Sequence, residues 1–414
     1  MLSVKASTQK HHASLQAIET RTENCVTARI LDRVDGMESV RSFWNAHESH
    51  PNNDLDYFIL IARSRKEVLG PLIIVLETGD KLHATLAGRI EDTRQKLRFG
   101  YMSCGSIRVR KLSLVTSGGL GEISCDDARR LIELIRSTLS VRRLDFAVLH
   151  NQPVDSWLAL KAQTEVPALL RDHGGREREH WRMSLPENFE EFLRRRKKKH
   201  RYWLNRLPRV LEKGFPGKVE TKVFETADSV ERFCRDADTI AALTYQRKLD
   251  AGFANVGETR EYCELLAARK ALKGCILYVD GKPCAYWLAS THRVILFLHA
   301  TGYDPAFRKY EVGTILFLKL IRDACGTVLE KVDFGLGAAD YKERFGDENW
   351  LEKDYYIFAT GIRGRILNGA ISGKMFAERI ARWLISKAGS IARLKKMWRQ
   401  RLVAAESRAQ TENP

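Results

Sequence analysis

The chain has 414 residues, 44% of them hydrophobic, and a formal net charge of +17 at pH 7. This length is too great for one ordinary hydrophobic core and predicts two domains. The positive charge indicates an anionic neighbour, a role that nucleic acid, an anionic membrane surface or a phosphorylated ligand would each fill. No stretch approaches ~20 consecutive apolar residues, so no membrane-spanning helix is expected.

The N-terminal residues and the cysteines indicate where the protein works. Residues 1–26 lack the apolar centre of a signal peptide, and we expect them to form a disordered arm. The eight cysteines are scattered and include no Cys-x-x-Cys pair, which argues against a zinc site and against a disulfide framework. The sequence therefore predicts a protein without a metal site that is cytoplasmic or peripheral at the inner face of the membrane.

The N-terminal half alternates β-rich runs with amphipathic segments. We predict strands at residues 27–34, 57–62, 69–76, 82–90, 112–115 and 143–149, and helices at 37–47 and 126–139. The runs at 57–62 and 69–76 flank the polar residues 63–67, a pattern that indicates a hairpin. Residues 117–121 are rich in glycine and predict a turn before the second helix.

A basic run connects the two halves. A helix is predicted to begin near Pro186 and to continue through eight adjacent basic residues, Arg194–Arg201. Such a run is either a solvated charged surface or a stripe that contacts phosphates, because adjacent like charges repel one another and are better tolerated beside an anion. Both interpretations stay open on the sequence alone.

The C-terminal half is organised around residues 294–346. We predict a strand at 219–224, a helix at 229–242, a hairpin at 275–279 and 283–289, a strand at 294–298, a helix at 314–325 and a strand at 331–335. Residues 308–313 form a basic turn between the last two strands, and a glycine-rich turn follows the second of them. The loops at the C-terminal ends of strands are where open α/β sheets bind ligands.

The two halves share a sequence feature that predicts duplication. Leu144-Asp145-Phe146 and Val332-Asp333-Phe334 each follow a glycine turn and a helix, and the two aspartates are 188 residues apart. We therefore expect Asp145 to superpose on Asp333, although chance similarity of two α/β units would give the same tripeptide. The first half lacks the Tyr-Lys segment that follows the second tripeptide, which indicates a degenerate copy.

Beyond residue 360 the chain is basic and amphipathic. Trp383, Leu384 and Trp398 alternate with arginine and lysine, as in a helix that lies on anionic lipid. A helix that packs on its own protein and ends in a frayed tail is the alternative interpretation.

The segments Gly313–Ala324 and Lys331–Gly346 resemble the acetyltransferase domain of the GNAT superfamily, in the branch related to cellulose-biosynthesis accessory proteins and to Fem-type aminoacyltransferases. The resemblance covers residues 270–358 best. It implies an α/β fold of two tandem GNAT-like domains, with a degenerate N-terminal domain at 27–185 and an acyltransferase domain at 186–360 that includes a basic helix at 187–213. A C-terminal helix and tail would then occupy residues 361–414.

The resemblance also implies a cofactor and a set of site residues. Acetyl-CoA or another acyl-CoA would be held by the turn before the buried helix, at Arg308, Lys309, Tyr310, Val312, Gly313 and Thr314. The helix N-terminus there presents unpaired N–H groups to the pyrophosphate. Glu311 departs from the family pattern, because a glycine is expected at that position.

Four residues are candidates for the chemistry. Tyr341 stands where the superfamily has its general acid, Lys342 would serve an anionic substrate or the leaving group, Asp333 would orient or bind, and His299 is the candidate base. Each has a structural alternative, such as a packed tyrosine, a surface lysine, a paired buried aspartate or a structural histidine.

Three functions remain open on the sequence. The first is an N-acetyltransferase or other acyltransferase that acts on an amine or hydroxyl of a small molecule, a saccharide or a cell-envelope precursor. The second is a Fem-like transfer from aminoacyl-tRNA, in which the basic helix would contact RNA. The third is a catalytically silent binding protein of a polysaccharide synthesis or export complex.

Overall fold

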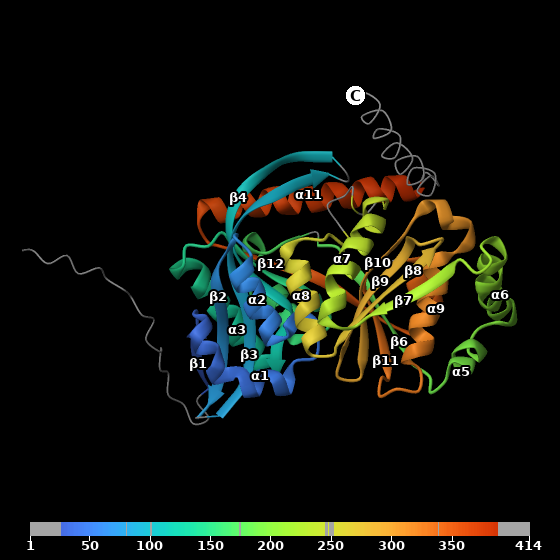
Figure 1. The fold of residues 1–414 in the computed structure, drawn as a ribbon. Coiled ribbons are helices and arrows are strands. Elements are labelled where there is room, and N and C mark those ends of the chain that lie inside the picture. Colours follow the sequence, from blue (N-terminus) through green and yellow to red (C-terminus); the bar gives the residue numbers. More distant parts are fainter. Residues whose placement is uncertain are drawn as a thin grey trace, which may run out of the picture.

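The computed structural model describes residues 26–387 except 80, 100–101, 174, 245–246, 248–251 and 338. Its described residues form one mixed sheet of 12 strands with helices on both faces (Figure 1). The predicted arm, apart from Val26, and the predicted tail beyond residue 387 lie outside the described part of the chain.

The N-terminal half supplies five consecutive strands of this sheet. Its elements are β1 (Val26–Leu31), α1 (Arg41–His47), α2 (Leu55–Ser64), β2 (Val68–Thr78), β3 (Lys81–Phe99), β4 (Met102–Gly121), α3 (Cys125–Val141), β5 (Phe146–Pro153) and α4 (Trp157–Thr164). Strands β1 to β4 are antiparallel neighbours, and β5 lies parallel to β4 after the crossover through α3.

Two predictions in this half are wrong. Residues 57–62, predicted as a strand, lie in α2, because Asp54 caps the helix by accepting from the N–H of Tyr57 and the buried Leu55, Phe58 and Ile61 recur at helical spacing. The predicted turn at 117–121 is the end of β4. A Cβ at Gly121 would lie 2.2 Å from the carbonyl oxygen of His83, so glycine there permits close strand pairing.

The C-terminal half repeats this order. Its elements are α5 (Phe189–Arg194), α6 (Lys198–Gly214), β7 (Val219–Phe224), α7 (Ala227–Ala242), α8 (Gly257–Ala268), β8 (Leu272–Val279), β9 (Lys282–His292), β10 (Ile295–Tyr303), α9 (Val312–Ala324), β11 (Lys331–Leu336) and α10 (Asp340–Phe345). Strands β7 to β10 are antiparallel neighbours, and β11 lies parallel to β10 after the crossover through α9. The two halves therefore share one topology.

The shared tripeptides do not coincide within this topology. The N–H of Asp145 donates to the carbonyl of Arg110 just before β4 and β5 pair, and the N–H of Glu330 donates to Val294 at the equivalent point of β10 and β11. Asp145 therefore corresponds to Glu330, and Asp333 lies three residues further along. The duplication holds for the strands, whereas the predicted superposition of the two aspartates is wrong.

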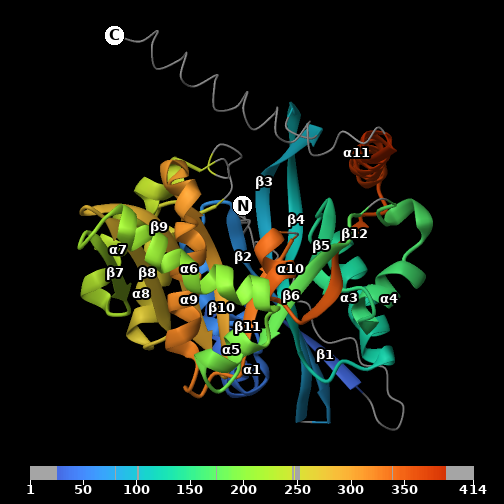
Figure 2. The ribbon, with the colours of Figure 1, turned by 90° about the vertical axis from the view of Figure 1, so that its right-hand side faces the viewer.

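The halves exchange their last strands, β6 (Arg178–Ser184) and β12 (Glu348–Phe358). In the strand order β1-β2-β3-β4-β5-β12-β6-β11-β10-β9-β8-β7, β6 pairs with β11 of the C-terminal half and β12 pairs with β5 of the N-terminal half. Figure 2 shows β5, β12, β6 and β11 together at the centre of the molecule. Neither half completes its sheet without a strand from the other. The chain then enters α11 (Ile362–Lys387).

The predicted basic helix at 187–213 is two helices. The chain breaks between α5 and α6, where Arg195 pairs with Glu191 and Arg196 lies over the ring of Phe192 at 4.8 Å. Arg196 also donates to the carbonyl oxygen of Phe345 at 3.2 Å. These two arginines therefore hold the break in place and belong to the fold.

Candidate active site

The parallel strands β10 and β11 separate just where the predicted site residues begin. Their pairing ends at Phe297 and Asp333. Directly afterwards both strands have a bulge. Beyond the bulges, β10 continues to pair with β9 as far as Tyr303, and β11 continues to pair with β6 as far as Leu336. Because bulges bend strands and disrupt the ladder, the two strands diverge here. We call the divergence between them the wedge.

The predicted cofactor turn lies beside the wedge. A 3-10 helix, Pro305–Tyr310, leads into α9, which begins at Val312 without a side-chain cap. The first N–H groups of a helix lack partners within the helix and carry a partial positive charge, so this end suits an anion. Trp287 of β9 donates to the carbonyl oxygen of Gly313 at 3.3 Å and fixes the turn against the sheet.

The six predicted cofactor residues come together in this turn but differ in role. Arg308 and Lys309 are exposed, whereas Val312 is fully buried. The ring of Tyr310 packs edge-on against Phe215 of the loop after α6. The two cations and the backbone are therefore available to a ligand, while Val312 and Tyr310 anchor the turn.

Glu311 adopts the left-handed conformation, with φ 54° and ψ 41°. This is the conformation that glycine adopts most readily, and a residue with a Cβ pays about 1 kcal/mol or more for it. Its carboxylate accepts from the hydroxyl of Thr314 at 3.3 Å. The backbone here therefore suits the glycine that was expected at this position, although the residue is a glutamate.

The equivalent helix of the N-terminal half is closed to anions. Ser124 accepts from the N–H of Asp127 at the start of α3, and Asp127 accepts from the N–H of Ser124 in return. Asp126 adds a second carboxylate in this first turn. Because Ser124 satisfies the N–H of Asp127, and the carboxylates of Asp126 and Asp127 repel negative charge, the start of α3 disfavours a phosphate.

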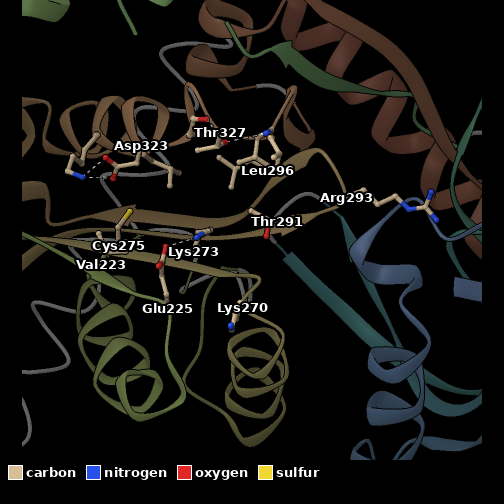
Figure 3. Close-up of a pocket in the computed structure, with 16 residues that line it drawn as sticks. Val223, Glu225, Lys270, Lys273, Cys275, Thr291, Arg293, Leu296, Asp323 and Thr327 are labelled. Carbon is tan, nitrogen blue, oxygen red and sulfur yellow. Dashed lines mark hydrogen bonds and ion pairs between the residues drawn. The ribbon is translucent and has the colours of Figure 1, made fainter. Parts of the chain in front are cut away.

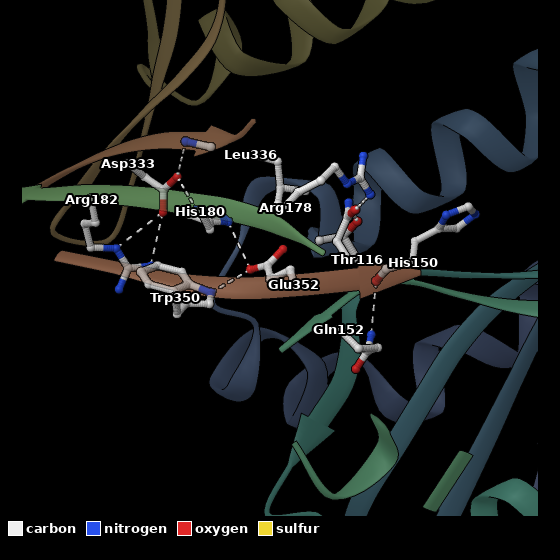
Figure 4. A network of polar contacts seen from close by, with 12 residues as sticks. Thr116, His150, Gln152, Arg178, His180, Arg182, Asp333, Leu336, Trp350 and Glu352 are labelled. Atoms are coloured by element: carbon white, nitrogen blue, oxygen red, sulfur yellow. Dashed lines mark hydrogen bonds and ion pairs between the residues drawn. The ribbon is translucent and has the colours of Figure 1, made fainter. Parts of the chain in front are cut away.

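The N-terminal counterpart of the wedge is filled by polar side chains (Figure 4). Asn151 just beyond the paired part of β5 donates to Thr116 of β4 at 2.9 Å and accepts from Arg178 at 2.6 Å. Arg178 also pairs with Asp354 of β12 at 3.2 Å. Side chains thus bridge β4 and β5 at the position where, in the C-terminal half, β10 and β11 separate.

Tyr341 lies on the α9 side of the sheet. Its ring is edge-on to Trp287, with centroids 5.7 Å apart, and to Phe334 at 6.0 Å. Burial raises the pKa of Tyr341 above its ordinary value, so the hydroxyl is protonated at neutral pH. Since Trp287 also contacts Gly313, Tyr341 and the cofactor turn lie on one side of the wedge.

Lys342 is buried and secures the turn after β11. Its ammonium donates to the carbonyl oxygens of Gly335 at 3.0 Å and Leu336 at 2.7 Å. Burial lowers the pKa of Lys342 to about 8, and the charge of Asp333 opposes that shift. These two bonds shape one edge of the wedge, and Lys342 is not the exposed surface lysine of the alternative interpretation.

His299 lies on the opposite side, in the bulge of β10. Its Nε2 is 2.7 Å from the hydroxyl of Ser290, and the ring is edge-on to Tyr262 of α8. Burial lowers the pKa of His299 to about 4, with the Asp333 charge opposing. The imidazole is therefore neutral at pH 7, and its lowered pKa makes it a weaker base than an ordinary histidine.

Asp333 is engaged on both oxygens. One oxygen accepts from Nε2 of His180 at 2.8 Å and from the N–H of Gly335 at 2.8 Å, and the other accepts from Arg182 at 3.1 Å. Burial would raise the pKa of Asp333, but His180 and Arg182 lower it overall. This arrangement favours an orienting role for Asp333 over a role in proton transfer.

His180 of β6 links this strand to its two neighbours, β11 and β12 (Figure 4). Its Nδ1 forms an ion pair of 2.9 Å with Glu352 of β12, and its ring stacks on Trp350. Burial alone would lower the pKa of His180, but Asp333 and Glu352 outweigh it and raise the pKa to about 9. Sequence analysis missed His180 and Glu352, although a buried aspartate required a cationic partner.

His50 of the N-terminal half also lies near the wedge, beside Phe297 of β10. Its ring is edge-on to Phe297, with centroids 5.0 Å apart, and its Nδ1 accepts from the N–H of Asn52. Burial lowers the pKa of His50 to about 4, and the charge of Asp333 opposes. No sequence signal placed His50 near residue 297, because their proximity depends on how the two halves pack.

A cavity of about 300 Å³ lies at the other end of β10, beside the start of that strand and the end of α9 (Figure 3). Its lining contains two ion pairs, Lys273 with Glu225 at 2.7 Å and Lys319 with Asp323, together with Lys270 and Arg293. The cavity contains none of the predicted site residues. We therefore place the candidate site at the wedge.

Comparison with known proteins gives a family match for part of the chain and structural matches for most of it. Residues 198–343 match the family model for an acetyltransferase (GNAT) domain. Among solved structures, FemX aligns with 80% of this chain and 98% of its own at a TM-score of 0.55 and 8% identity. No curated protein sequence matches the chain.

Two further structures align less well. A tandem GNAT protein from the clavulanic acid biosynthesis pathway aligns at a TM-score of 0.48 and 10% identity, over 81% of this chain and 99% of its own. The L-PGS structure from Bacillus licheniformis aligns at 0.47 and 11%, over 82% and 96%.

The protein therefore contains a GNAT-type acyltransferase domain. Its whole fold consists of two GNAT-like halves, as in the FemX alignment that spans both. The resemblance predicted from the sequence is confirmed at the level of fold. No helix among the described residues is long and apolar enough to cross a membrane.

The buried charges around His180 predict a pH-dependent stability. With a folded pKa of about 9 and an unfolded value near 6.5, the contribution of His180 is complete below pH ~6.5 and is lost as the pH rises through 9. The comparison protein is the double variant His180→Gln/Glu352→Gln, which removes one charge of each sign. Between these pH limits the free energy of unfolding of the wild type should fall by up to roughly 3 kcal/mol more than that of the double variant.

Urea unfolding at several pH values between 6 and 10 measures this difference. The double variant keeps Lys342, whose lowered pKa acts in the opposite direction, so that contribution cancels in the comparison. Parallel curves for the two proteins would show that His180 is not held as a cation.

The position of Glu311 in the predicted cofactor turn leads to a prediction about the affinity for coenzyme A. Glu311→Gly should raise the affinity for coenzyme A, because it removes a carboxylate beside the helix N-terminus and lets the backbone approach the anion more closely. Stability should stay within about 1 kcal/mol of the wild type. Calorimetric titration measures the affinity, with Glu311→Gln as the control that removes only the charge. A glycine variant no tighter than wild type would place the anion elsewhere.

Proposed function

We propose that the C-terminal half transfers an acyl group from acetyl-CoA or another acyl-CoA to an amine or hydroxyl. A saccharide or cell-envelope precursor is the proposed acceptor class. The observation that carries this proposal is the divergence of β10 and β11 beside the N-terminus of α9, which has no side-chain cap. The equivalent positions of the N-terminal half are closed by Asn151 and by the Ser124–Asp127 cap.

The residues at the wedge fit an acyl-CoA. An extended chain of amides can pair with the backbone groups of two diverging strands as an added strand would. Arg308, Lys309 and the N–H groups of Val312 and Gly313 would hold the pyrophosphate. Bound acyl-CoA would supply an activated thioester, and the chain must supply the proton transfers.

Two proton-transfer groups lie on opposite sides of the wedge. Leu296 and Leu298 pack in the core with α9 residues, whereas His299 contacts Tyr262 of α8 on the other face. In our proposal His299 takes the proton of the acceptor from that face, and Tyr341 protonates the departing thiolate from the α9 face. Asp333 and Lys342 hold the edges of the wedge in position.

Substitutions on the α9 side should separate chemistry from binding. Tyr341→Phe keeps the ring packing and removes the proton donor, so kcat should fall roughly 10²–10⁴-fold while the Kd for coenzyme A stays nearly unchanged. Gly313→Glu should abolish coenzyme A binding, because it adds a carboxylate at the helix N-terminus. Thiol release and calorimetry measure the two effects.

Gly313→Ala is the matched control. A Cβ at this position would meet Tyr303 at 3.7 Å, an ordinary contact, so the alanine variant should fold normally and bind far better than the glutamate variant. If the wild type binds no coenzyme A and neither variant changes turnover on any amine or sugar, the acyltransferase proposal fails. The silent binding protein would then be the better interpretation.

A transfer from aminoacyl-tRNA is the second candidate, favoured by the exposed cations at the junction of α5 and α6. Arg194, Lys197, Lys198 and Lys199 are exposed. Two of them lie in the first turn of a helix, where positive charge is unfavourable without an anion. This surface would contact a nucleic acid backbone under the second candidate and solvent under the first.

Replacing these four residues with glutamine tests the second candidate. If the surface binds tRNA, affinity should fall and the slope of log K against log salt should decrease by up to about 3. Filter binding over a salt series measures both. The control replaces four exposed cations elsewhere, namely Arg33, Lys66, Lys213 and Lys282. Equal slopes in all three proteins would make the run a solvated surface.

A further inference from the structure

Helix α11 presents a continuous apolar stripe to the surroundings. Six large side chains at helical spacing form it: Ile362 (78% exposed), Ile366 (65%), Phe376 (58%), Ile380 (42%), Trp383 (54%) and Leu384 (55%). At 100° per residue they fall within an arc of about 100°, and the glycines at 369 and 373 fall within the same arc. We call this surface the α11 stripe.

The α11 stripe is not the face that packs on the protein. Leu367 and Ile371 are buried with Phe358 in a core of their own, and Met375 packs against the same core. Asn368 donates to the carbonyl oxygen of Leu169. These residues lie on the opposite side of the helix, so α11 has one apolar face for the protein and a second that the described residues leave exposed.

Basic residues accompany the stripe. Helix α11 contains six arginines and lysines and one acidic residue, Glu378. By helical position, Arg363 and Lys374, which pair with Asp145 and Glu378, lie on one side of the stripe, and Arg365 and Arg379 lie at and beyond its other margin. An apolar centre with cations along both sides is the pattern of a helix that lies in the interface of an anionic bilayer.

Other basic residues lie at the same edge of the sheet. Strand β12 runs parallel to β11 and antiparallel to β5. One edge of the sheet therefore holds the start of α11, the C-terminal end of β11 and the point where β3 meets β4. Figure 1 shows α11 running along this edge beside the β3–β4 arm. That arm exposes Arg94, Arg108 and Arg110.

We propose that this edge docks on an anionic lipid bilayer, with α11 lying in the plane of the surface and its stripe inserted among the lipid headgroups. A second copy of the chain is a poorer occupant, because two such surfaces would bring their flanking cations together. A bilayer with anionic lipids satisfies the apolar stripe and the cations at once.

Vesicle flotation with the full-length chain tests the proposal. The protein should float with phosphatidylcholine vesicles that contain roughly 30% phosphatidylglycerol and should bind pure phosphatidylcholine at least about tenfold more weakly. Ile366→Ser/Phe376→Ser/Ile380→Ser should lose at least about tenfold in binding to the anionic vesicles. Circular dichroism checks that the variant remains folded.

Two controls keep the result specific. Tyr202→Ser/Val328→Ser removes side chains that are 71% and 80% exposed elsewhere and should bind as the wild type does. Arg365→Gln/Arg379→Gln should weaken binding and reduce its salt dependence. Together these results would assign both parts of the pattern to lipid.

Three outcomes would overturn the proposal. One is a wild type that does not float with anionic vesicles. Another is a dimer in sedimentation that the stripe variant converts to a monomer, without vesicle binding by either. The last is binding that appears only after residues 388–414 are removed, which would show that the chain's own C-terminal segment covers the stripe.

Discussion

The architecture depends on a set of buried charges where the two halves exchange strands. His180 and Arg182 come from β6, Asp333 from β11 and Glu352 from β12, and their formal charges sum to zero when His180 is protonated. Removing one partner of such a set leaves an uncompensated buried charge, at a cost of about 3–5 kcal/mol. Because the set spans three strands from both halves, it fixes the register of the exchange. It also fixes Asp333, at which β10 and β11 part.

The same exchange explains which parts of the fold the sequence could predict. Local patterns located most strands, the crossover helices and the duplication, because these depend on periodicity within one segment. The strand predicted at 57–62 failed because its β-rich composition hid helical spacing set by the cap at Asp54. The Asp145–Asp333 equivalence failed because a shared tripeptide carries no register, which the pairing of Asp145 with Arg110 reveals.

Sequence analysis could likewise predict some residues of the candidate site and not others. Sequence analysis grouped the predicted cofactor turn, Tyr341 and His299, since these lie within one continuous crossover unit. It could not locate His180, Glu352 or His50, because these approach the wedge only through strand exchange or through packing of the N-terminal half. Lys342 was predicted as a chemical group, yet its two carbonyl partners make it part of the frame around the site. A buried polar residue thus signalled that partners exist without identifying them.

The duplication also shows how one topology gives two different sets of side chains where the parallel strands part. Both halves have a parallel pair of strands that parts before a crossover helix, so the backbone alone would provide two wedges. The difference lies in side chains of ordinary size: Asn151 and Thr116 bridge the first wedge, and the Ser124–Asp127 cap satisfies its helix. In the second half, glycine at 335 and 337 and an uncapped α9 leave these positions free. The N-terminal half instead contributes β6, whose His180 and Arg182 hold Asp333, and His50, which packs against Phe297.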